Sequence, residues 1–320
     1  MGNEFLLLSR DAQIALNQFS SAFALALTQP AVDPWARMLG FYQSGRFRTS
    51  FPIPLSAAGY AELKGDLKYR SLFEKSFSLT PKTWQDGVSA LASVLEAPDF
   101  LGWAQEPAAM AAAAMSLPNE IIAALIEANS ATDGEGKARW DGKAFFATDH
   151  PVNLFSSAAG TYSNLITGAG TDPTTANLAI AMTNFDKMKA PNGKPLGLRM
   201  THVLHPPSQR DKWKKILEQD ILVQAVGSAF AGVDNIYKGS VTPICSYELT
   251  NDSKWYPMAL NKPGMYPWVV QDEGAPEEIR LDKSSDFYKQ TLKVSLAYVL
   301  RGGGELAMPA CMQSWAGTAP

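Results

Sequence analysis

Apolar and polar residues alternate in two runs in the first quarter of the chain, at residues 47–55 and 67–79. Alternation with a period of two is typical of a β-strand that has one buried face. The segment between the runs contains Gly59 and Gly65, so the two strands are predicted to form a long β-hairpin. A two-stranded hairpin is only marginally stable in water. We therefore expect its apolar side to be covered, either by the body of the same chain or by a neighbouring one.

Other segments show the period of a helix. Residues 11–27 carry apolar side chains on one face and are predicted to form a helical N-terminal arm that is loosely tied to the rest. Residues 99–129 are rich in Ala and Met and are expected to form the longest helix. A further helix is expected to have Asp86 as its N-cap, and shorter helices are expected after Pro173 and from Ser208 onward.

The last third of the chain is predicted to contain strands at residues 198–204, 266–271 and 288–300. Three consecutive glycines, at residues 302–304, are expected to break the last of these strands by a tight bend or bulge. The chain has no internal repeat and mixes helices with strands, and its predicted fold class is α+β.

Composition narrows the class of protein. The 320 residues are 46% hydrophobic and 18% charged, which excludes disordered and collagen-like chains. The charged fraction is below the ~25% usual for soluble domains, as in a protein that hides surface against other chains. The net charge of −3 and the missing basic stripe leave only non-specific contact with nucleic acid. A poor signal peptide and no apolar run of membrane length lead us to expect a cytoplasmic protein without membrane contact.

Residues that could carry chemistry are few. Cys245 and Cys311 have no short-range partner and are expected to be reduced thiols. His202 and His205 are three residues apart on a predicted strand, so they should point to opposite faces and not form a metal pair. No catalytic, cofactor-binding or metal site is predicted.

His150 follows Asp149 and precedes a proline. A hydrolase could use this pair, but it would need a serine in position, and no Gly-x-Ser-x-Gly turn exists in the sequence. The favoured interpretation is a buried polar bridge that orders the loop after Phe145 and Phe146. The hydrolase stays open as the weaker alternative.

A motif lies at residues 141–152, with the form Asp-Gly-x-x-Phe-Phe-x-x-x-His-Pro, and is followed by Tyr-Ser-Asn at residues 162–164. The motif and the order of the predicted elements resemble the major capsid proteins of tailed phages, in particular the Mu-like major head subunit family. The resemblance implies the Hong Kong 97-type capsid fold and no enzymatic activity.

The resemblance implies five parts: an N-terminal arm at 1–38, an extended hairpin loop at 39–86, a peripheral domain with a spine helix at 87–196, an axial domain at 197–265, and strands that return to the peripheral domain at 266–320. Contacts between subunits are expected from the apolar residues of the hairpin and the arm. These are Phe51, Ile53, Phe73, Phe77, Phe19 and Phe23.

The resemblance also implies how the subunit assembles and which partners it contacts. It should form hexamers and pentamers of an icosahedral shell around double-stranded DNA, first in the host cytoplasm and then in the virion. A portal and a possible decoration protein are implied partners. A separate scaffolding protein is expected because a long charged N-terminal scaffolding segment is missing. The alternative within this fold is an encapsulin-type compartment that encloses enzymes.

Overall fold

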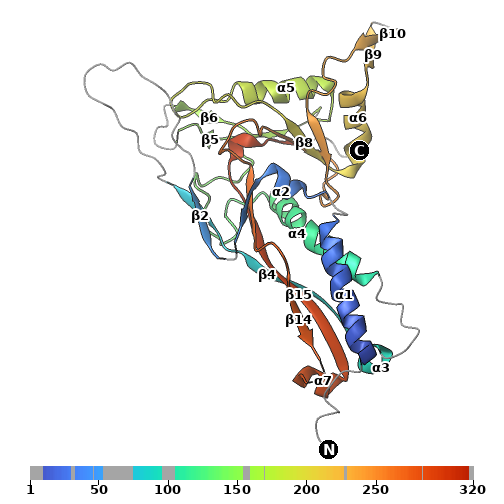
Figure 1. The fold of residues 1–320 in the computed structure, drawn as a ribbon. Helices are drawn as coiled ribbons and strands as arrows, with labels where there is room; N and C mark the ends of the chain where they lie inside the picture. The colour runs from blue at the N-terminus through green and yellow to red at the C-terminus, as the bar shows by residue number, and fades with distance from the viewer. Residues whose placement is uncertain are drawn as a thin grey trace, which may run out of the picture.

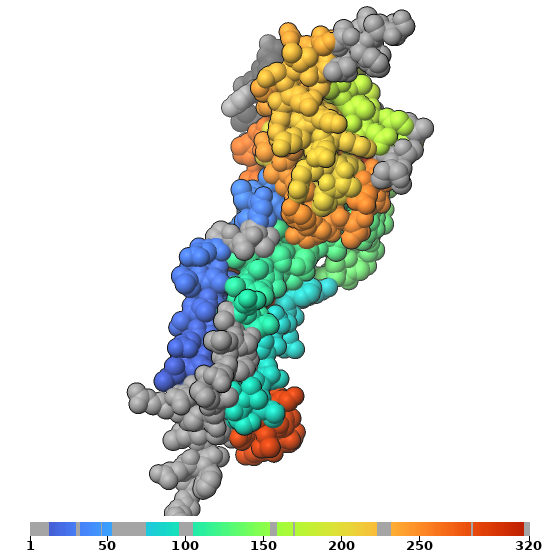
Figure 2. All heavy atoms as spheres, turned by 90° about the vertical axis from the view of Figure 1, so that its right-hand side faces the viewer, coloured from blue at the N-terminus to red at the C-terminus, as the bar shows by residue number. Residues whose placement is uncertain are grey.

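The computed structural model describes residues 10–29, 33–45, 47–52, 75–95, 105–153, 159–168, 170–226, 229–282 and 284–316. The molecule is elongated, with a broad upper body and a narrow lower part (Figures 1 and 2). The helices are α1 (Arg10–Thr28), α2 (Trp35–Leu39), α3 (Ala92–Leu95), α4 (Glu106–Ala128), α5 (Thr175–Asp186), α6 (Arg210–Glu218) and α7 (Asp286–Thr291), with short 3₁₀ turns at Pro207–Gln209 and Pro309–Cys311.

The lower part is built on a five-stranded sheet with β15 (Lys293–Leu306) at its centre. One edge of β15 pairs antiparallel with β4 (Lys82–Leu91) at ten consecutive positions. Its other edge pairs with β14 (Glu277–Leu281) and then with β13 (Trp268–Asp272), also antiparallel. β1 (Phe41–Ser44) extends the sheet by pairing parallel with β13.

The helix predicted to begin at Asp86 is wrong, because residues 82–91 form strand β4 and only the four-residue α3 follows. Val88, Leu91, Ala92 and Leu95 fit a helical face by spacing, but pairing with β15 outweighs this local preference. Gly87 lies opposite Ala297, and a Cβ atom at Gly87 would stand 2.8 Å from the Cβ of Ala297. Gly87 therefore allows β4 and β15 to pack closely, and it is not part of a turn.

The three glycines at 302–304 do not break the last strand, contrary to the prediction, since β15 runs through them to Leu306. Their lack of a side chain makes room for neighbouring elements. A Cβ atom at Gly304 would lie 2.7 Å from Cδ1 of Ile122 on α4, and one at Gly303 would lie 3.3 Å from Cδ1 of Leu79. The long strand also begins later than predicted, because residues 286–291 form α7, with Ser285 as N-cap.

Helix α4 runs along this sheet and confirms the predicted long helix (Figure 1). By length and composition alone it could cross a membrane, with a mean hydropathy of 1.6, but it packs here against α1, α2 and β15. The prediction of a loosely tied arm is wrong for the described residues of α1. That helix lies against α4, because Leu16, Phe19 and Phe23 are buried in one cluster with residues of α4 and β15.

The upper body contains a second five-stranded sheet in the order β11-β8-β12-β16-β7. Its strands are β11 (Thr242–Cys245), β8 (His202–His205), β12 (Lys254–Met258), β16 (Ser314–Ala316) and β7 (Leu165–Thr167). α5 and α6 pack beside it in the largest hydrophobic cluster, which includes Trp213, Trp255 and Trp315. Strands β7 and β16 bring two segments that are distant in sequence from β8, β11 and β12 into this sheet.

Among the described residues, three separate two-stranded pairs complete the fold. They are β2 (Thr49–Pro52) with β3 (Ser76–Leu79), β5 (His150–Pro151) with β6 (Thr161–Tyr162), and β9 (Ile221–Val226) with β10 (Ala229–Asp234). All three pairs are antiparallel. The first confirms the base of the predicted hairpin, while residues 53–74 lie outside the described residues.

Candidate functional site

The base of the hairpin is a small aromatic assembly. Phe51 on β2 stacks on Phe77 on β3 with ring centroids 5.4 Å apart, and Phe41 on β1 meets Phe51 edge to face. These rings line a cavity of about 160 Å³ together with Tyr266 and Met308. Phe51 is thus buried against its own chain. Ile53 and Phe73, also predicted to contact other subunits, lie outside the described residues.

One carboxylate ties the hairpin base to the body. Glu135 accepts a hydrogen bond from the Thr80 hydroxyl at 2.6 Å and pairs with Arg48 at 3.0 Å. Arg48 precedes β2 and Thr80 follows β3, so a single residue holds both ends of the base. Hydrogen bonds from Thr80 and Lys137 are the main reason why the pKa of Glu135 lies below its ordinary value. Sequence reasoning missed this residue, because its two partners in the hairpin base are far away in the sequence.

The loop that carries Glu135 is itself anchored on the sheet by a buried ion pair. Arg139 lies 3.0 Å from Glu305 on β15, and both side chains are almost fully buried. Glu305 also accepts hydrogen bonds from the backbone N–H groups of Gly134 and Leu306. Burial raises the pKa of Glu305, and Arg139 opposes that effect. The chain of contacts therefore runs from the hairpin base through this loop to the central strand.

His150 of the 141–152 motif is fully buried and has all its ring nitrogens in use. Nδ1 lies 2.6 Å from the carboxylate of Asp141, and Nε2 lies 3.1 Å from both the Phe145 carbonyl and Oδ1 of Asn164. All three partners are oxygen atoms, and they hold the ring from both of its nitrogens. The ring also stacks on Tyr162. The prediction of a buried polar bridge is confirmed.

Asn164, from the second part of the motif, joins this bridge to the C-terminal segment. Its Nδ2 donates to the carbonyl oxygens of Phe145, Pro309 and Met312, and its Oδ1 accepts from the backbone N–H of Ala147. Four hydrogen bonds to the backbone fix the orientation of the amide. The motif thus encodes a structural node that connects the loop after α4 with the end of the chain.

The hydrolase alternative finds no support in this geometry. The carboxylate of Asp149 forms an ion pair with Lys143, and His150 takes Asp141 as its partner instead. His202 is half-buried and contacts Thr201, whereas His205 is buried against Trp213. In the described residues no three His, Cys, Asp or Glu side chains lie close enough to hold a metal ion.

Polar side chains of α4 hold three distant segments in place. Asn119 accepts a hydrogen bond from the backbone N–H of Ala36, and Glu127 accepts from both the N–H and the hydroxyl of Thr250. Asn129, the C-cap in left-handed conformation, exchanges two hydrogen bonds with the backbone of Phe146. The helix therefore works as a spine between the lower sheet and the upper body.

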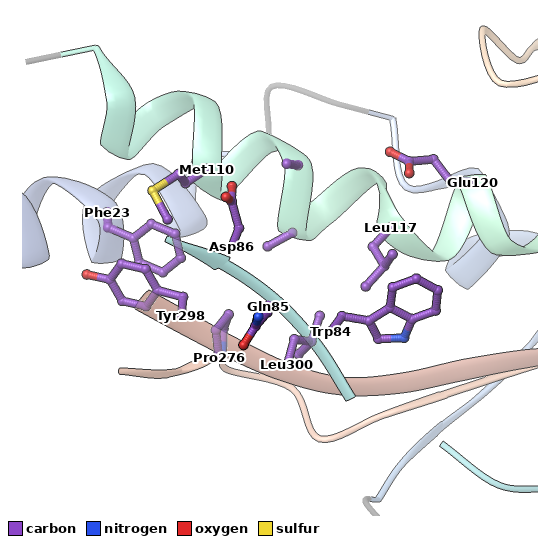
Figure 3. Close-up of a pocket in the computed structure, with 12 residues that line it drawn as sticks. Phe23, Trp84, Gln85, Asp86, Met110, Leu117, Glu120, Pro276, Tyr298 and Leu300 are labelled. Atoms are coloured by element: carbon purple, nitrogen blue, oxygen red, sulfur yellow. The ribbon is translucent and has the colours of Figure 1, made fainter. Parts of the chain in front are cut away.

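The arm residues Phe19 and Phe23 pack within their own chain. Phe23 stacks on Tyr298 of β15 at 3.6 Å between ring centroids. Beside this stack a groove of about 230 Å³ runs between α4 and the sheet. Figure 3 shows Phe23 and Tyr298 at one end of the groove and Trp84 with Leu117 at the other. That Phe19 and Phe23 also contact a second subunit stays a prediction.

Comparisons with known proteins agree on one class. The family described as "Phage capsid protein" matches residues 99–305, which span α4 to the end of β15. The procapsid of bacteriophage JBD30 superposes with a TM-score of 0.55 at 14% identity, covering 98% of this chain and 77% of the other. A virus-like particle from Pyrococcus furiosus gives 0.53 at 10% identity, with 94% and 99% covered. No curated protein matches the chain in sequence.

The spine helix, the long-stranded lower sheet, the upper body and the hairpin base define a viral shell subunit with the Hong Kong 97-type fold. The chain belongs to the phage capsid protein family, since the match covers well over half of its length. It is a structural protein with major capsid function and no enzymatic one. The narrower assignment to the Mu-like subunits stays a prediction.

Proposed function

We propose that copies of this chain form rings of five and six that close into an icosahedral head around double-stranded DNA. The observation that carries the proposal is the family match over residues 99–305, which includes the spine helix and most strands of the two five-stranded sheets. Head-to-tail contacts close a ring only if the angle between neighbours is right. Each such interface would bury on the order of 1,600 Å².

The five predicted parts serve as the working division of the subunit, with two changes that follow from strand pairing. β1 would join the peripheral sheet, and β7 and β16 would join the axial part. The hairpin and the arm would lie across neighbouring subunits. Because Phe51 and Phe77 already pack at the hairpin base, Ile53 and Phe73 are the better candidates for contacts in the far half.

The remaining partners follow from the family alone. A scaffolding protein, a portal and a possible decoration protein would join during assembly in the host cytoplasm. A net charge of −3 fits an inner surface that touches DNA without reading sequence, because DNA carries its own counterions. An encapsulin-type shell around enzyme cargo remains the second candidate, and the contents of particles purified from the native source would separate the two.

Electron microscopy of the purified protein tests the proposal, and a deletion of residues 56–66 tests the hairpin. Wild-type protein should form closed shells. The deletion should give folded subunits without shells, because the far half of the hairpin would no longer reach a neighbour. Wild-type protein that stays monomeric at high concentration would overturn the proposal.

A replacement of residues 56–66 by an equally long Gly/Ser segment is the matched control. If this variant fails like the deletion, the sequence of the segment is needed for assembly. If it forms shells, only the length matters. Normal shells from the deletion itself would remove the hairpin from the assembly mechanism while leaving the family assignment intact.

A further inference from the structure

The β9–β10 hairpin stands out from the far end of the upper body, above α6 (Figure 1). Its two strands pair over six positions, from Ile221 opposite Asp234 to Val226 opposite Ala229. In the part of the chain that the structure describes, neither strand pairs with a third one. The sequence from 221 to 233 contains no charged residue. Exposed edge strands are normally protected by charges or proline, whereas this hairpin has no proline and carries its one charge, Asp234, at the last position of β10.

The base of the hairpin is held firmly, so its direction is set by the body. Nδ2 of Asn235 donates to the carbonyl oxygens of Ile216 and Gln219 at the end of α6, at 2.7 and 2.8 Å. The backbone N–H of Gly239 donates to the carbonyl of Leu217, also at the end of this helix. Ile216 and Leu217 are in turn buried in the main hydrophobic cluster.

Exposed apolar side chains gather where the hairpin leaves the body. Ile221, Val233 and Ile236 are 58%, 40% and 80% exposed. Ile221 begins β9, Val233 lies near the end of β10, and Ile236 follows two residues after that strand. A projecting element with apolar residues at its base and no charge from residue 221 to residue 233 is typical of a surface that becomes covered.

The register shows which backbone groups face outward. The N–H of Asn235 donates to the carbonyl of Asp220 at 2.8 Å, so this pair is hydrogen-bonded within the hairpin. Hydrogen-bonded and non-hydrogen-bonded pairs alternate along an antiparallel ladder. Outward N–H and C=O groups therefore belong to alternate residues on both strands. On β9 these are Ile221, Val223 and Ala225, and on β10 they are Phe230, Gly232 and Asp234.

We propose that β10 of one subunit pairs with β9 of the next, so that the hairpins of a five- or six-membered ring close into a continuous antiparallel annulus. This inference rests on the proposed function, because it needs rings of copies. The occupant of each free edge is a second copy for two reasons. The two edges have the same length of six residues, and joining one to the other around a rotation axis leaves no edge open.

Residue-resolved hydrogen exchange on the full-length protein tests this pairing. In assembled shells the outward amides of Val223, Ala225 and Phe230 should exchange at least about tenfold more slowly than in unassembled subunits. The inward amide of Gln224 should be protected in both states. Equal exchange of the outward amides in the two states would overturn the annulus although shells form, whereas an absence of shells would speak against the proposed function itself. Protection that appears only after a different virion protein is added would also overturn it.

Ala225→Pro tests the same pairing by removing one outward donor, and Ala225→Ser is its matched control. The N–H of residue 225 makes no bond inside the hairpin by this register, so the proline should leave the subunit folded. We expect the yield of shells to fall at least about tenfold for the proline variant and to stay at the wild-type level for the serine variant. Wild-type yield from the proline variant would overturn the proposal. If that variant fails to fold, hydrogen exchange on the wild type decides.

Discussion

At the scale of single residues, buried polar groups hold the loops of this subunit in place. His150 is the clearest case, because its two ring nitrogens meet three acceptors and the ring is fully buried. Removing one member of such a pair leaves the other without a partner in a place that water cannot reach. The motif that resembles phage capsid proteins is therefore informative about packing and not about catalysis.

His150→Ala should lower the free energy of unfolding by about 3–5 kcal/mol, because Oδ2 of the buried Asp141 carboxylate loses its partner and only Oδ1 keeps the hydrogen bond from the backbone N–H of Lys143. Urea denaturation of unassembled subunits measures this effect. Asp149→Asn is the control, since Asp149 pairs only with the exposed Lys143 and its loss should leave stability nearly unchanged. If both variants lose the same free energy of unfolding, the buried His150–Asp141 pair contributes no more to stability than the exposed Lys143–Asp149 pair.

The two cysteines should differ in reactivity. Burial raises the pKa of Cys311 to about 12, so almost none of it is thiolate at pH 8. Cys245 is partly exposed. Native protein treated with iodoacetamide at pH 8 should gain one label, at Cys245, and denatured protein should gain two. Labelling of Cys311 in native subunits, detected by mass spectrometry, would show that the centre of the upper body opens to solvent.

At the scale of elements, sequence patterns located most helices but misjudged strands that depend on distant partners. The helices at residues 11–27 and 99–129 follow from local periodicity, and the structure confirms both. Strand β4 does not, because its Asp86-Gly87 pair looks like a helix start until β15 is placed beside it. The glycines at 302–304 were misread for the same reason: the elements they accommodate lie far away in the chain.

The candidate site was predictable to a similar extent. The polar bridge at His150 follows from the motif, and alternation predicts the hairpin that carries Phe51 and Phe77. The stacking of these two rings on each other was not predicted, because both residues were expected to contact other subunits. Glu135 could not be found this way, because its partners Arg48 and Thr80 are 87 and 55 residues away in sequence.

The tether at Glu135 should respond to pH in a defined direction. Because its pKa is lowered from 4.5, chiefly by the hydrogen bond from Thr80, the charged form is favoured in the folded state. Its contribution is fully present above pH 4.5 and is lost as the pH falls through the lowered pKa. Hydrogen exchange of the backbone amides of β2 and β3 should therefore accelerate as the pH falls through the lowered pKa of Glu135.

Glu135→Gln should remove this response, because its amide cannot pair as an anion with Arg48. The variant should show at pH 7 the faster exchange of the hairpin base that wild type shows only in acid. Lys137→Gln leaves both hairpin contacts in place and serves as the control. Unchanged exchange in the Glu135 variant would mean that the aromatic contacts alone hold the base.

At the scale of the whole molecule, the core is divided along the length of the subunit. One hydrophobic cluster fills the upper body, a second surrounds the spine near α2, and a third joins α1 to the far part of α4 and β15. A narrow body with separate clusters can open locally without unfolding everywhere. The lower end is the natural place for such opening, because in the described part of the chain one layer of helices, α1 and α4, packs on its sheet (Figure 1).

Phe23→Ala should reveal this division. Loss of the ring that stacks on Tyr298 should cost about 3–5 kcal/mol, confined to the third cluster. In unassembled subunits, exchange should accelerate in α1 and at residues 294–298, while the fluorescence of Trp213 and Trp255 in the upper body should keep its wild-type transition. Leu178→Ala, in the first cluster, should give the reverse pattern. If either variant instead destabilises the first and the third cluster together, the subunit unfolds as one unit. Any change of shape during shell assembly must then be a rigid-body movement and not local opening at the lower end.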